Sequence, residues 1–272
     1  MRTLLLLSLA IPALTADPLC TRDFLLAAAN TLLAAQTAGN PSLLGPLSAS
    51  PVISQNEKPS TLTASILSTP IKADHTRHSL DTTQCATYTE FISAKGAKPY
   101  VNGYQLWFTN GTISKVDALT TTTGDWLFNA TGTLNWAAKE DWGVIPVEKR
   151  DSRAVIKAGA DAYLDIFSDK SVVVPWGKPC ARLEGGAYTG NGGANDRCDV
   201  GIPDNVKLVN RRYVIDETVG AVDVMLTFGS LADSHEFRLE GGKLRFVHTI
   251  TPMNGSRGPT VGKGKGRKVR RG

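Results

Sequence analysis

The stretch His235–Thr251, HEFRLEGGKLRFVHTIT, repeats the pattern of Tyr104–Thr120, YQLWFTNGTISKVDALT, at an offset of 131 residues without a gap. In both stretches apolar and polar residues alternate on either side of a turn dipeptide, Asn110-Gly111 in the first and Gly241-Gly242 in the second. Alternation around such a dipeptide is typical of two antiparallel strands joined by a tight turn. Two matching hairpins at one offset predict a duplicated unit.

A helical segment precedes each hairpin. Thr21–Ala35 and Asp151–Asp165 both start with a residue type that caps helices and continue with apolar residues at helical spacing. Further strands are expected at Asp81–Phe91 and Glu217–Phe228. Each unit is therefore predicted to hold a helix, an irregular segment and about three long strands. This is an α+β layout with helices packed on curved antiparallel sheets. Two unrelated α+β segments are the alternative.

The two ends of the chain differ from its body. Arg2, the apolar run Leu4–Ile11 and the small residues up to Ala16 indicate a cleaved signal peptide over residues 1–16, with a buried helix as the alternative. Residues 253–272 are rich in glycine and basic residues and lack acidic ones, which predicts a disordered basic tail. Subtracting the seven bases of 254–272 and Arg2 from the formal net charge of +5 leaves −3, so the basic character belongs to the tail.

These features divide the rest of the chain into a first unit (17–125), a connection (126–150) and a second unit (151–252). No stretch after the signal peptide is long and apolar enough to span a bilayer. Aromatic residues are not interleaved with bases as they are in a nucleic-acid platform. We therefore expect a secreted, extracellular protein, with cell-wall association left open, that neither inserts stably into membranes nor binds nucleic acid. The oligomeric state stays open.

The four cysteines have no metal-binding spacing, and an even number in a secreted chain indicates disulfides. Three connectivities are possible, and we expect Cys20–Cys85 and Cys180–Cys198 because each pair then lies within one half of the chain. Asn110 and Asn129 begin Asn-x-Thr sequons and are candidate glycosylation sites.

A helix followed by a hairpin-rich sheet that ends in a long strand resembles the NTF2-like (SnoaL-like, cystatin-like cone) fold, here in tandem. Four segments also resemble a family of secreted filamentous-fungal proteins without an established activity: Gly124–Gly132, Lys149–Ile156, Val174–Tyr188 and Asn210–Glu217. The fold resemblance implies a cone with an apolar pocket between helices and sheet. Because relatives with this fold include isomerases, cyclases, dehydratases and non-enzymatic binders, the fold alone does not choose a function.

His248 is the candidate catalytic residue. Alternation places it with Leu244, Phe246 and Ile250 on one apolar strand face, so it is expected in the core or in a pocket. Its counterpart in the first unit is Asp117, and an ionisable group at one place in both copies suits a general acid or base. A structural histidine that is satisfied by a buried hydrogen bond is the alternative.

Further pocket candidates come from the second unit. Tyr163 lies on the inner stripe of the helix, where its hydroxyl is a second candidate for catalysis. Trp176 follows the helix and is expected at the mouth of the cone. Arg211 and Tyr213 lie on the next expected strand, where an inward arginine could bind a carboxylate or an enolate of the ligand. His235 begins a later strand, so it is a candidate for the rim of the pocket.

No cofactor or metal site is predicted, because His75 and His78 lack a third ligand. The most favoured function is the binding of a small hydrophobic molecule in an NTF2-like pocket. The alternative is a cofactor-independent isomerase, cyclase or dehydratase that acts on a hydrophobic secondary metabolite.

Overall fold

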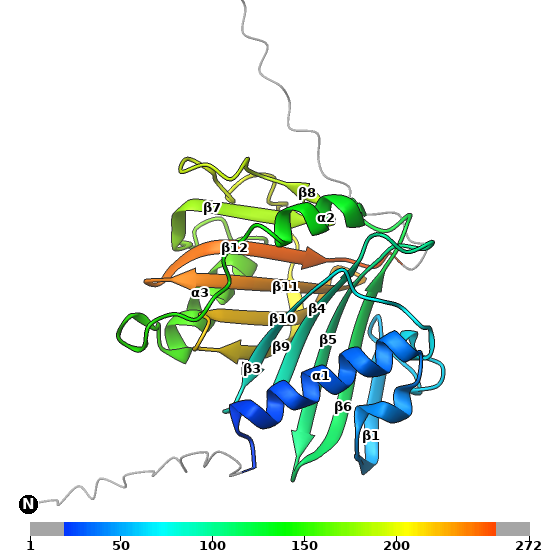
Figure 1. The fold of residues 1–272 in the computed structure, drawn as a ribbon. Helices are drawn as coiled ribbons and strands as arrows, with labels where there is room; N and C mark the ends of the chain where they lie inside the picture. Colours follow the sequence, from blue (N-terminus) through cyan, green and yellow to red (C-terminus); the bar gives the residue numbers. More distant parts are fainter. Residues whose placement is uncertain (1–18, 254–272) are drawn as a thin grey trace, which may run out of the picture.

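The computed structural model describes residues 19–253, which form an α+β fold with two six-stranded mixed sheets (Figure 1). The predicted signal peptide and, from residue 254, the predicted tail lie outside the described residues. Within 19–253 no helix is long and apolar enough to cross a membrane.

The elements follow one another in two similar series. The first series is α1 (Arg22–Ala38), η1 (Pro41–Leu44), β1 (Leu47–Gln55), β2 (Lys58–Pro59), η2 (Ile66–Ser68), β3 (His75–Asp81), β4 (Ala86–Ser93), β5 (Tyr100–Thr109) and β6 (Thr112–Thr121). The connection holds α2 (Ala130–Ala137) and η3 (Val147–Lys149). The second series is α3 (Arg153–Asp165), β7 (Trp176–Glu184), β8 (Ala187–Tyr188), β9 (Leu208–Asp216), β10 (Ala221–Phe228), β11 (Leu231–Glu240) and β12 (Lys243–Ile250).

Both sheets have the same topology. The strand orders are β2-β1-β6-β5-β4-β3 and β8-β7-β12-β11-β10-β9. In each sheet four consecutive strands pair antiparallel, and the first strand of the unit pairs parallel with the last. The repeated hairpins predicted the same strand order in both units. Each unit has one more long antiparallel strand than the three expected, and it also has a parallel strand that was not expected.

The helix starts differ in one detail from the prediction. Thr21 caps α1 by accepting a hydrogen bond from the backbone N–H of Phe24. The cap of α3 is Ser152 rather than the predicted Asp151. Asp151 instead accepts a hydrogen bond from the backbone N–H of Gly242 in the β11–β12 turn. Its carboxylate therefore ties the start of the helix to the hairpin.

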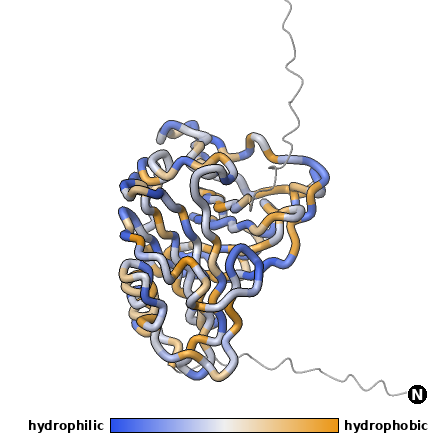
Figure 2. The backbone as a smooth tube through the Cα atoms, turned by 90° about the vertical axis from the view of Figure 1, so that its right-hand side faces the viewer, coloured by the Kyte–Doolittle hydropathy of each residue, from blue (hydrophilic) through white to orange (hydrophobic). Residues whose placement is uncertain are grey.

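The two sheets pack against each other, and α1 and α3 cover their outer faces (Figure 1). Hydrophobic and hydrophilic segments alternate along the strands (Figure 2), as expected for sheets with two different faces. Each helix closes a core with its own sheet. A third core joins the two sheets with α2, and its buried members are Ala86, Tyr88, Ile92, Val101, Leu119, Ala130, Ala137, Leu183, Val214, Met225, Ala232 and Ile250.

A pair of reciprocal contacts joins the edge strands β3 and β9. Asp81 accepts a hydrogen bond from the backbone N–H of Ile215 and pairs with Arg153 at 2.6 Å. Asp216 accepts one from the backbone N–H of Leu80 and pairs with Arg22 at 2.7 Å. Each aspartate thus binds a strand and a helix of the opposite unit, which relates the units by a pseudo-two-fold.

The disulfides are Cys20–Cys85 and Cys180–Cys198, the predicted connectivity. The first ties the residue before the cap of α1 to the β3–β4 turn. The second closes the loop that follows β7.

Candidate functional site

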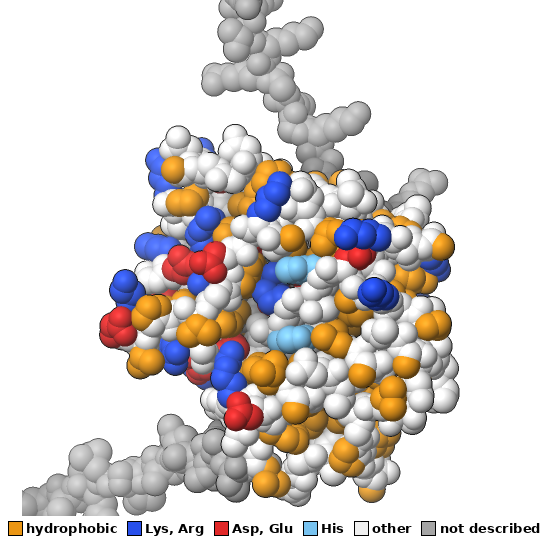
Figure 3. Space-filling model, viewed as in Figure 1, with side chains coloured by type: hydrophobic (Ala, Val, Ile, Leu, Met, Phe, Trp, Pro, Cys, Tyr) orange, Lys and Arg blue, Asp and Glu red, His pale blue; other side chains and the backbone are white. Residues whose placement is uncertain are grey.

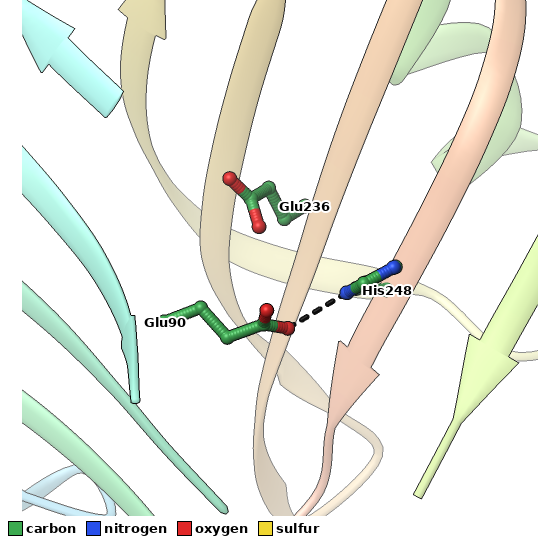
Figure 4. Close-up of side chains that lie close together, drawn as sticks. All are labelled: Glu90, Glu236 and His248. Carbon is green, nitrogen blue, oxygen red and sulfur yellow. Dashed lines mark hydrogen bonds and ion pairs between the residues drawn. The ribbon is translucent and has the colours of Figure 1, made fainter. Parts of the chain in front are cut away.

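The side chain of His248 lies between the two sheets. Its Nδ1 is 2.7 Å from Glu90 Oε1 on β4, and its Nε2 is 2.6 Å from Glu140 Oε2 in the connection. Figure 4 shows Glu90 reaching across from β4 of the first sheet to His248, with Glu236 nearby on β11. The ring of Trp142 packs edge-on against the imidazole. Residues from both units and from the connection therefore surround His248.

Arg77 on β3 completes this inter-sheet cluster, which we define as Arg77, Glu90, Glu140, Glu236 and His248. Its Nη2 contacts Glu236, lies 3.1 Å from Glu90 Oε2 and lies 3.2 Å from His248 Nδ1. Its guanidinium also stacks on the ring of Trp142 at 3.7 Å. A buried cation thus stands in the middle of the carboxylates.

Mutual contacts set the charges of the inter-sheet cluster. Burial alone would lower the pKa of His248, but Glu140 and Glu90 outweigh it and raise the pKa to about 9. Burial opposes ionisation of Glu90 and Glu140, yet Arg77 and His248 lower the pKa of Glu90, and His248 lowers that of Glu140. Burial, with the charge of Glu90, raises the pKa of Glu236. At neutral pH His248 is therefore a cation held by two carboxylates.

The geometry does not support metal binding by this cluster. Ligand atoms of Glu90, Glu236 and His248 lie within 4.8 Å of one another. However, Arg77 Nη2 contacts all three side chains, so a guanidinium occupies the position an ion would take. The two partly exposed histidines, His75 and His78, belong to no group of three potential ligands within 19–253. Histidine side chains do reach the surface near the centre of one face (Figure 3).

The imidazole of His248 is buried. It is 3 % exposed and lines none of four cavities described among residues 19–253. Of the cluster, Glu140 lines one of these four, a surface hollow of about 520 Å³ beside Tyr188. A general base must reach the proton that it removes. The surroundings of His248 therefore favour the structural alternative, in which it joins the sheets.

Tyr163 packs against the helix side of the second sheet, so it does not meet His248, which points to the other side. Side chains alternate between these two faces: Glu236 pairs with His248 on one face, whereas His235 pairs with Thr249 on the other.

A β-bulge changes the face of Leu244. The register shifts between Leu244 and Phe246, so Leu244 lies on the helix side, contrary to the expectation that it shares the face of His248.

A cavity lies between α3 and the second sheet. About 30 Å³ of it is open to the centre of a water-sized group, within about 420 Å³ of empty space that includes open solvent. Four aromatic side chains form much of its wall. The lining residues are Trp126, Tyr163, Phe167, Arg182, Glu184, Gly201, Pro203, Phe228, His235, Thr249 and Thr251. The space is large enough for a water molecule or a small polar group.

His235 forms one polar side of this cavity. Its Nδ1 lies 2.7 Å from Asp233 Oδ2, although neither atom makes a hydrogen bond within the described residues, and Asp233 Oδ1 accepts a hydrogen bond from Thr251 at 2.6 Å. Both residues are buried, and the imidazole packs among Tyr163, Phe167 and Phe237. The aromatic rings therefore restrict the orientation of the imidazole.

An arginine forms the other polar side. Arg182 on β7 donates to the Tyr163 hydroxyl at 3.2 Å and lies 3.3 Å from Glu184, which accepts a hydrogen bond from Trp126. Burial opposes the charge of Arg182, but Tyr163 and Glu184 raise its pKa, so it stays charged. Burial raises the pKa of Tyr163, which stays neutral.

Three buried polar atoms of the lining residues make no hydrogen bond within residues 19–253: Thr249 Oγ1, His235 Nδ1 and Arg182 Nε. His235 Nδ1 and Arg182 Nε each lie near a carboxylate, whereas no ion pair is described for the hydroxyl of Thr249, a residue that is only 8 % exposed. A buried hydroxyl left without a partner costs about 1–3 kcal/mol. Such a group is usually satisfied by a water or by a ligand.

The equivalent place in the first unit is a filled core. The shared register aligns His235 with Tyr104 and Asp233 with Asn102. Tyr104 donates to Gln36 and accepts a hydrogen bond from Asn102, so a neutral network fills the space. The positions of Tyr163, Arg182 and Thr249 are held there by Leu32, Ile53 and Ala118. The ionisable cavity groups occur in the second unit alone.

The other candidate residues lie outside this cavity. Arg211 and Tyr213 bind Asp161 on α3, and Arg211 also binds Asp165. Trp176 packs edge-on against the ring of Tyr163. It does not line this cavity but lines a separate surface hollow of about 410 Å³. Asp117, the counterpart of His248, lies between the sheets with partners in both units, which are Ser54, Lys115 and Arg212.

Both candidate glycosylation sites are exposed. Asn110 lies in the β5–β6 turn with a positive φ of 50°. Asn129 precedes α2 and caps it, because its side-chain oxygen accepts a hydrogen bond from the backbone N–H of Gly132.

The comparisons with known proteins match the second unit. Residues 149–251 match the family model described as a domain of unknown function (DUF8021). No curated protein and no solved structure matches the chain. The matched segment contains Tyr163, Arg182, Asp233 and His235, so four of the polar groups around the cavity lie in the part that resembles this uncharacterised domain.

Proposed function

We propose that the second unit binds a small, largely hydrophobic molecule in the cavity between α3 and its sheet, in the manner of an NTF2-like pocket. The observation that carries this proposal is an aromatic cavity into which a few polar groups converge, His235, Arg182 and the unpartnered hydroxyl of Thr249. Small-molecule sites commonly combine apolar walls with a few such groups.

The size of the cavity limits the ligand. Only about 30 Å³ is open to the centre of a water-sized group, which suits a small polar group such as a carbonyl or a carboxylate. The rest of the ligand then lies in the open part of the cavity. A flat molecule with one polar end suits this shape.

A plug at the mouth tests the proposal. Pro203→Trp places a large ring over the opening, and Val200→Trp places the same ring three residues earlier, at an exposed position outside the cavity. Binding of the dye 1-anilinonaphthalene-8-sulfonate is measured by fluorescence titration. We expect the affinity to fall at least tenfold in Pro203→Trp and to stay unchanged in Val200→Trp. Equal binding by both variants would contradict the proposal.

We also propose that the protein is secreted, with a signal peptide over residues 1–16. The charged and apolar pattern of the N-terminus and the two disulfides support this, because disulfides persist in oxidising compartments. N-terminal sequencing of the exported protein is expected to begin at Asp17. An intact Met1 on exported protein would contradict it.

A second candidate function is a cofactor-independent enzyme, such as an isomerase, cyclase or dehydratase. The 2.7 Å contact of Asp233 with His235, which lines the cavity, favours it, because a histidine close to a carboxylate is common in acid–base catalysis.

A further inference from the structure

We infer that the surface hollow beside α2 binds a short chain of sugar acids, which are carbohydrate rings that carry a carboxylate. Arg245 holds a carboxylate, and an aromatic wall made by Trp136 and Tyr188 contacts a sugar ring. The hollow is separate from the cavity of the proposed function. Its lining residue Phe246 shares the face of the second sheet with His248, which is the face opposite to α3.

The hollow is large enough for such a ligand. It forms where α2 lies beside β7 and β8 (Figure 1). Its volume of about 520 Å³ lies within the range of about 300–1,000 Å³ that is typical of small-molecule sites. Five of its ten lining residues are charged, so the lining suits a ligand rich in hydroxyl groups better than a hydrophobic one.

The carboxylates of the hollow already have partners in the chain. Glu140 belongs to the inter-sheet cluster, and its Oε1 accepts a hydrogen bond from the hydroxyl of Tyr188 at 3.0 Å. Glu240 Oε1 accepts a hydrogen bond from Arg238 Nε at 2.7 Å. Asp141 accepts one at 2.8 Å from the backbone N–H two residues further on. The acidic groups therefore do not require a cationic ligand.

The cations of the hollow have no such partners. The side chains of Lys139 and Arg245 make no hydrogen bond or ion pair within residues 19–253. Each lies over an aromatic ring instead, with the guanidinium carbon of Arg245 4.0 Å from the ring centre of Phe246. Stacking occupies the face of a guanidinium and leaves its N–H edge free. Because that edge pairs with a carboxylate through two parallel hydrogen bonds, Arg245 is suited to anchor one.

A β-bulge places Arg245. The two residues that flank it pair with consecutive residues of β11, so Arg245 is the extra residue. Bulges re-aim side chains and often lie next to binding sites. The first unit has the same bulge with Ser114 as the extra residue, and its hydroxyl donates to the backbone carbonyl of Trp107 at 3.2 Å. The repeated fold therefore has the bulge in both units but the arginine in one.

The aromatic wall is rigid. The rings of Trp136 and Tyr188 stack at 4.0 Å between centroids with an interplanar angle of 4°. Glu140 fixes the hydroxyl of Tyr188, and the shared register aligns Tyr188 with Pro59 of the first unit. The C–H face of a sugar ring can pack on such an apolar wall. The side chain of Asn191, which also lines the hollow, can both donate to and accept from sugar hydroxyls.

A second hollow extends the site. It has a volume of about 410 Å³ and shares Glu240 and Arg245 with the first. It adds Lys178 and Lys243, whose side chains make no ion pair within the described residues. Arg245 thus stands between two open spaces with further cations on both sides. This arrangement suits several linked sugar acids better than a single one.

Calorimetric titration of the full chain with trigalacturonate, a linear chain of three sugar acids, tests the inference. We expect binding by the unaltered protein, and an affinity about tenfold or more lower in Arg245→Ser, which installs the residue of the first unit. Arg197→Ser is the matched control. It removes an exposed arginine that is paired with Asp199 outside the hollow, and it should bind normally.

Two further ligands separate the contributions of charge and ring. The trimethyl ester of trigalacturonate keeps the rings and loses the charges, whereas tricarballylate has three carboxylates and no ring. Both should bind about tenfold or more weakly than trigalacturonate at the same ionic strength. Trp136→Leu should lower the affinity for trigalacturonate about fivefold and leave that for tricarballylate unchanged.

Several outcomes would overturn the inference. They are no binding of trigalacturonate by the unaltered protein, equal binding by Arg245→Ser, and equal binding of the ester. Equal binding of tricarballylate, or equal competition by single-stranded DNA of the same charge, would show attraction of any polyanion and would exclude a sugar-acid site. Thermal unfolding of each variant is compared with that of the unaltered protein, to show that it is folded.

Discussion

His235 in the second unit and Tyr104 in the first occupy the same position of the repeated fold, and they use it in opposite ways. Tyr104 is tied to Gln36 and Asn102 in a filled core. His235 lines a cavity with a carboxylate behind it. One copy of the position belongs to a hydrogen-bonded core, and the other has a histidine that lines a cavity.

Tyr104→Phe is predicted to destabilise the first unit. The change removes a buried hydroxyl and leaves the side chains of Gln36 and Asn102 without that partner, which costs about 1–3 kcal/mol. Urea unfolding measures the loss. Tyr213→Phe, at a half-exposed hydroxyl that binds Asp161, is the control and should lose less. An equal loss of stability in both variants would contradict the prediction, because the buried hydroxyl of Tyr104 would then contribute no more than the half-exposed hydroxyl of Tyr213.

Stability is predicted to fall as the pH rises from 6.5 to about 9, because of His248. The pKa of this group is raised from 6.5 to about 9, so its stabilising effect is complete below 6.5 and is lost as the pH passes through 9. The effect amounts to about 3 kcal/mol. Glu90 and Glu140 have lowered pKa values and stay ionised in this window.

Urea unfolding at pH 6 and pH 9.5 measures this dependence. His248→Gln should flatten it. His78→Gln should keep it, because burial and Arg77 lower the pKa of His78 to about 4 and leave that ring neutral at both values. An unchanged slope in His248→Gln would show that other groups cause the dependence.

Arg77→Met is predicted to cost about 3–5 kcal/mol of stability, since it leaves buried carboxylates without their cation. Glu90 and Glu236 are both 1 % exposed and both contact Arg77 Nη2. Adding Glu236→Gln to this variant should recover part of the loss. Arg197→Met removes an exposed ion pair with Asp199 and should change nothing measurable. A double variant as unstable as the single one would refute this view of the cluster.

The sequence predicted features that depend on neighbours along the chain. Alternation and turn dipeptides indicated the hairpins, Thr21 indicated the first helix, and the division into halves indicated the disulfide pairs. Each of these signals is local, or is repeated at a constant offset. The α+β class followed from them.

The features that were missed depend on contacts between distant segments. Arg77, Glu90 and Glu140 surround His248 only because the two sheets and the connection meet there. The bulge in β12 turned Leu244 away from the face of His248, which a strict period of two does not foresee. Asp233 was missed, whereas His235, two residues further along the same strand, had been named as a pocket candidate from its place near a strand end.

The reciprocal contacts of Asp81 and Asp216 relate the two units of this chain as the subunits of a symmetric homodimer are related, although both units belong to one polypeptide. In a homodimer every substitution appears at both related places, so a charge added at one must be tolerated at the other. Fusion removes that constraint. The position of His248 in the second unit corresponds to Asp117 in the first, and the position of Glu90 in the first corresponds to Met225 in the second. The two members of each pair differ in charge. Within one chain, the first unit can therefore keep a filled core at a position where the second unit has a cavity.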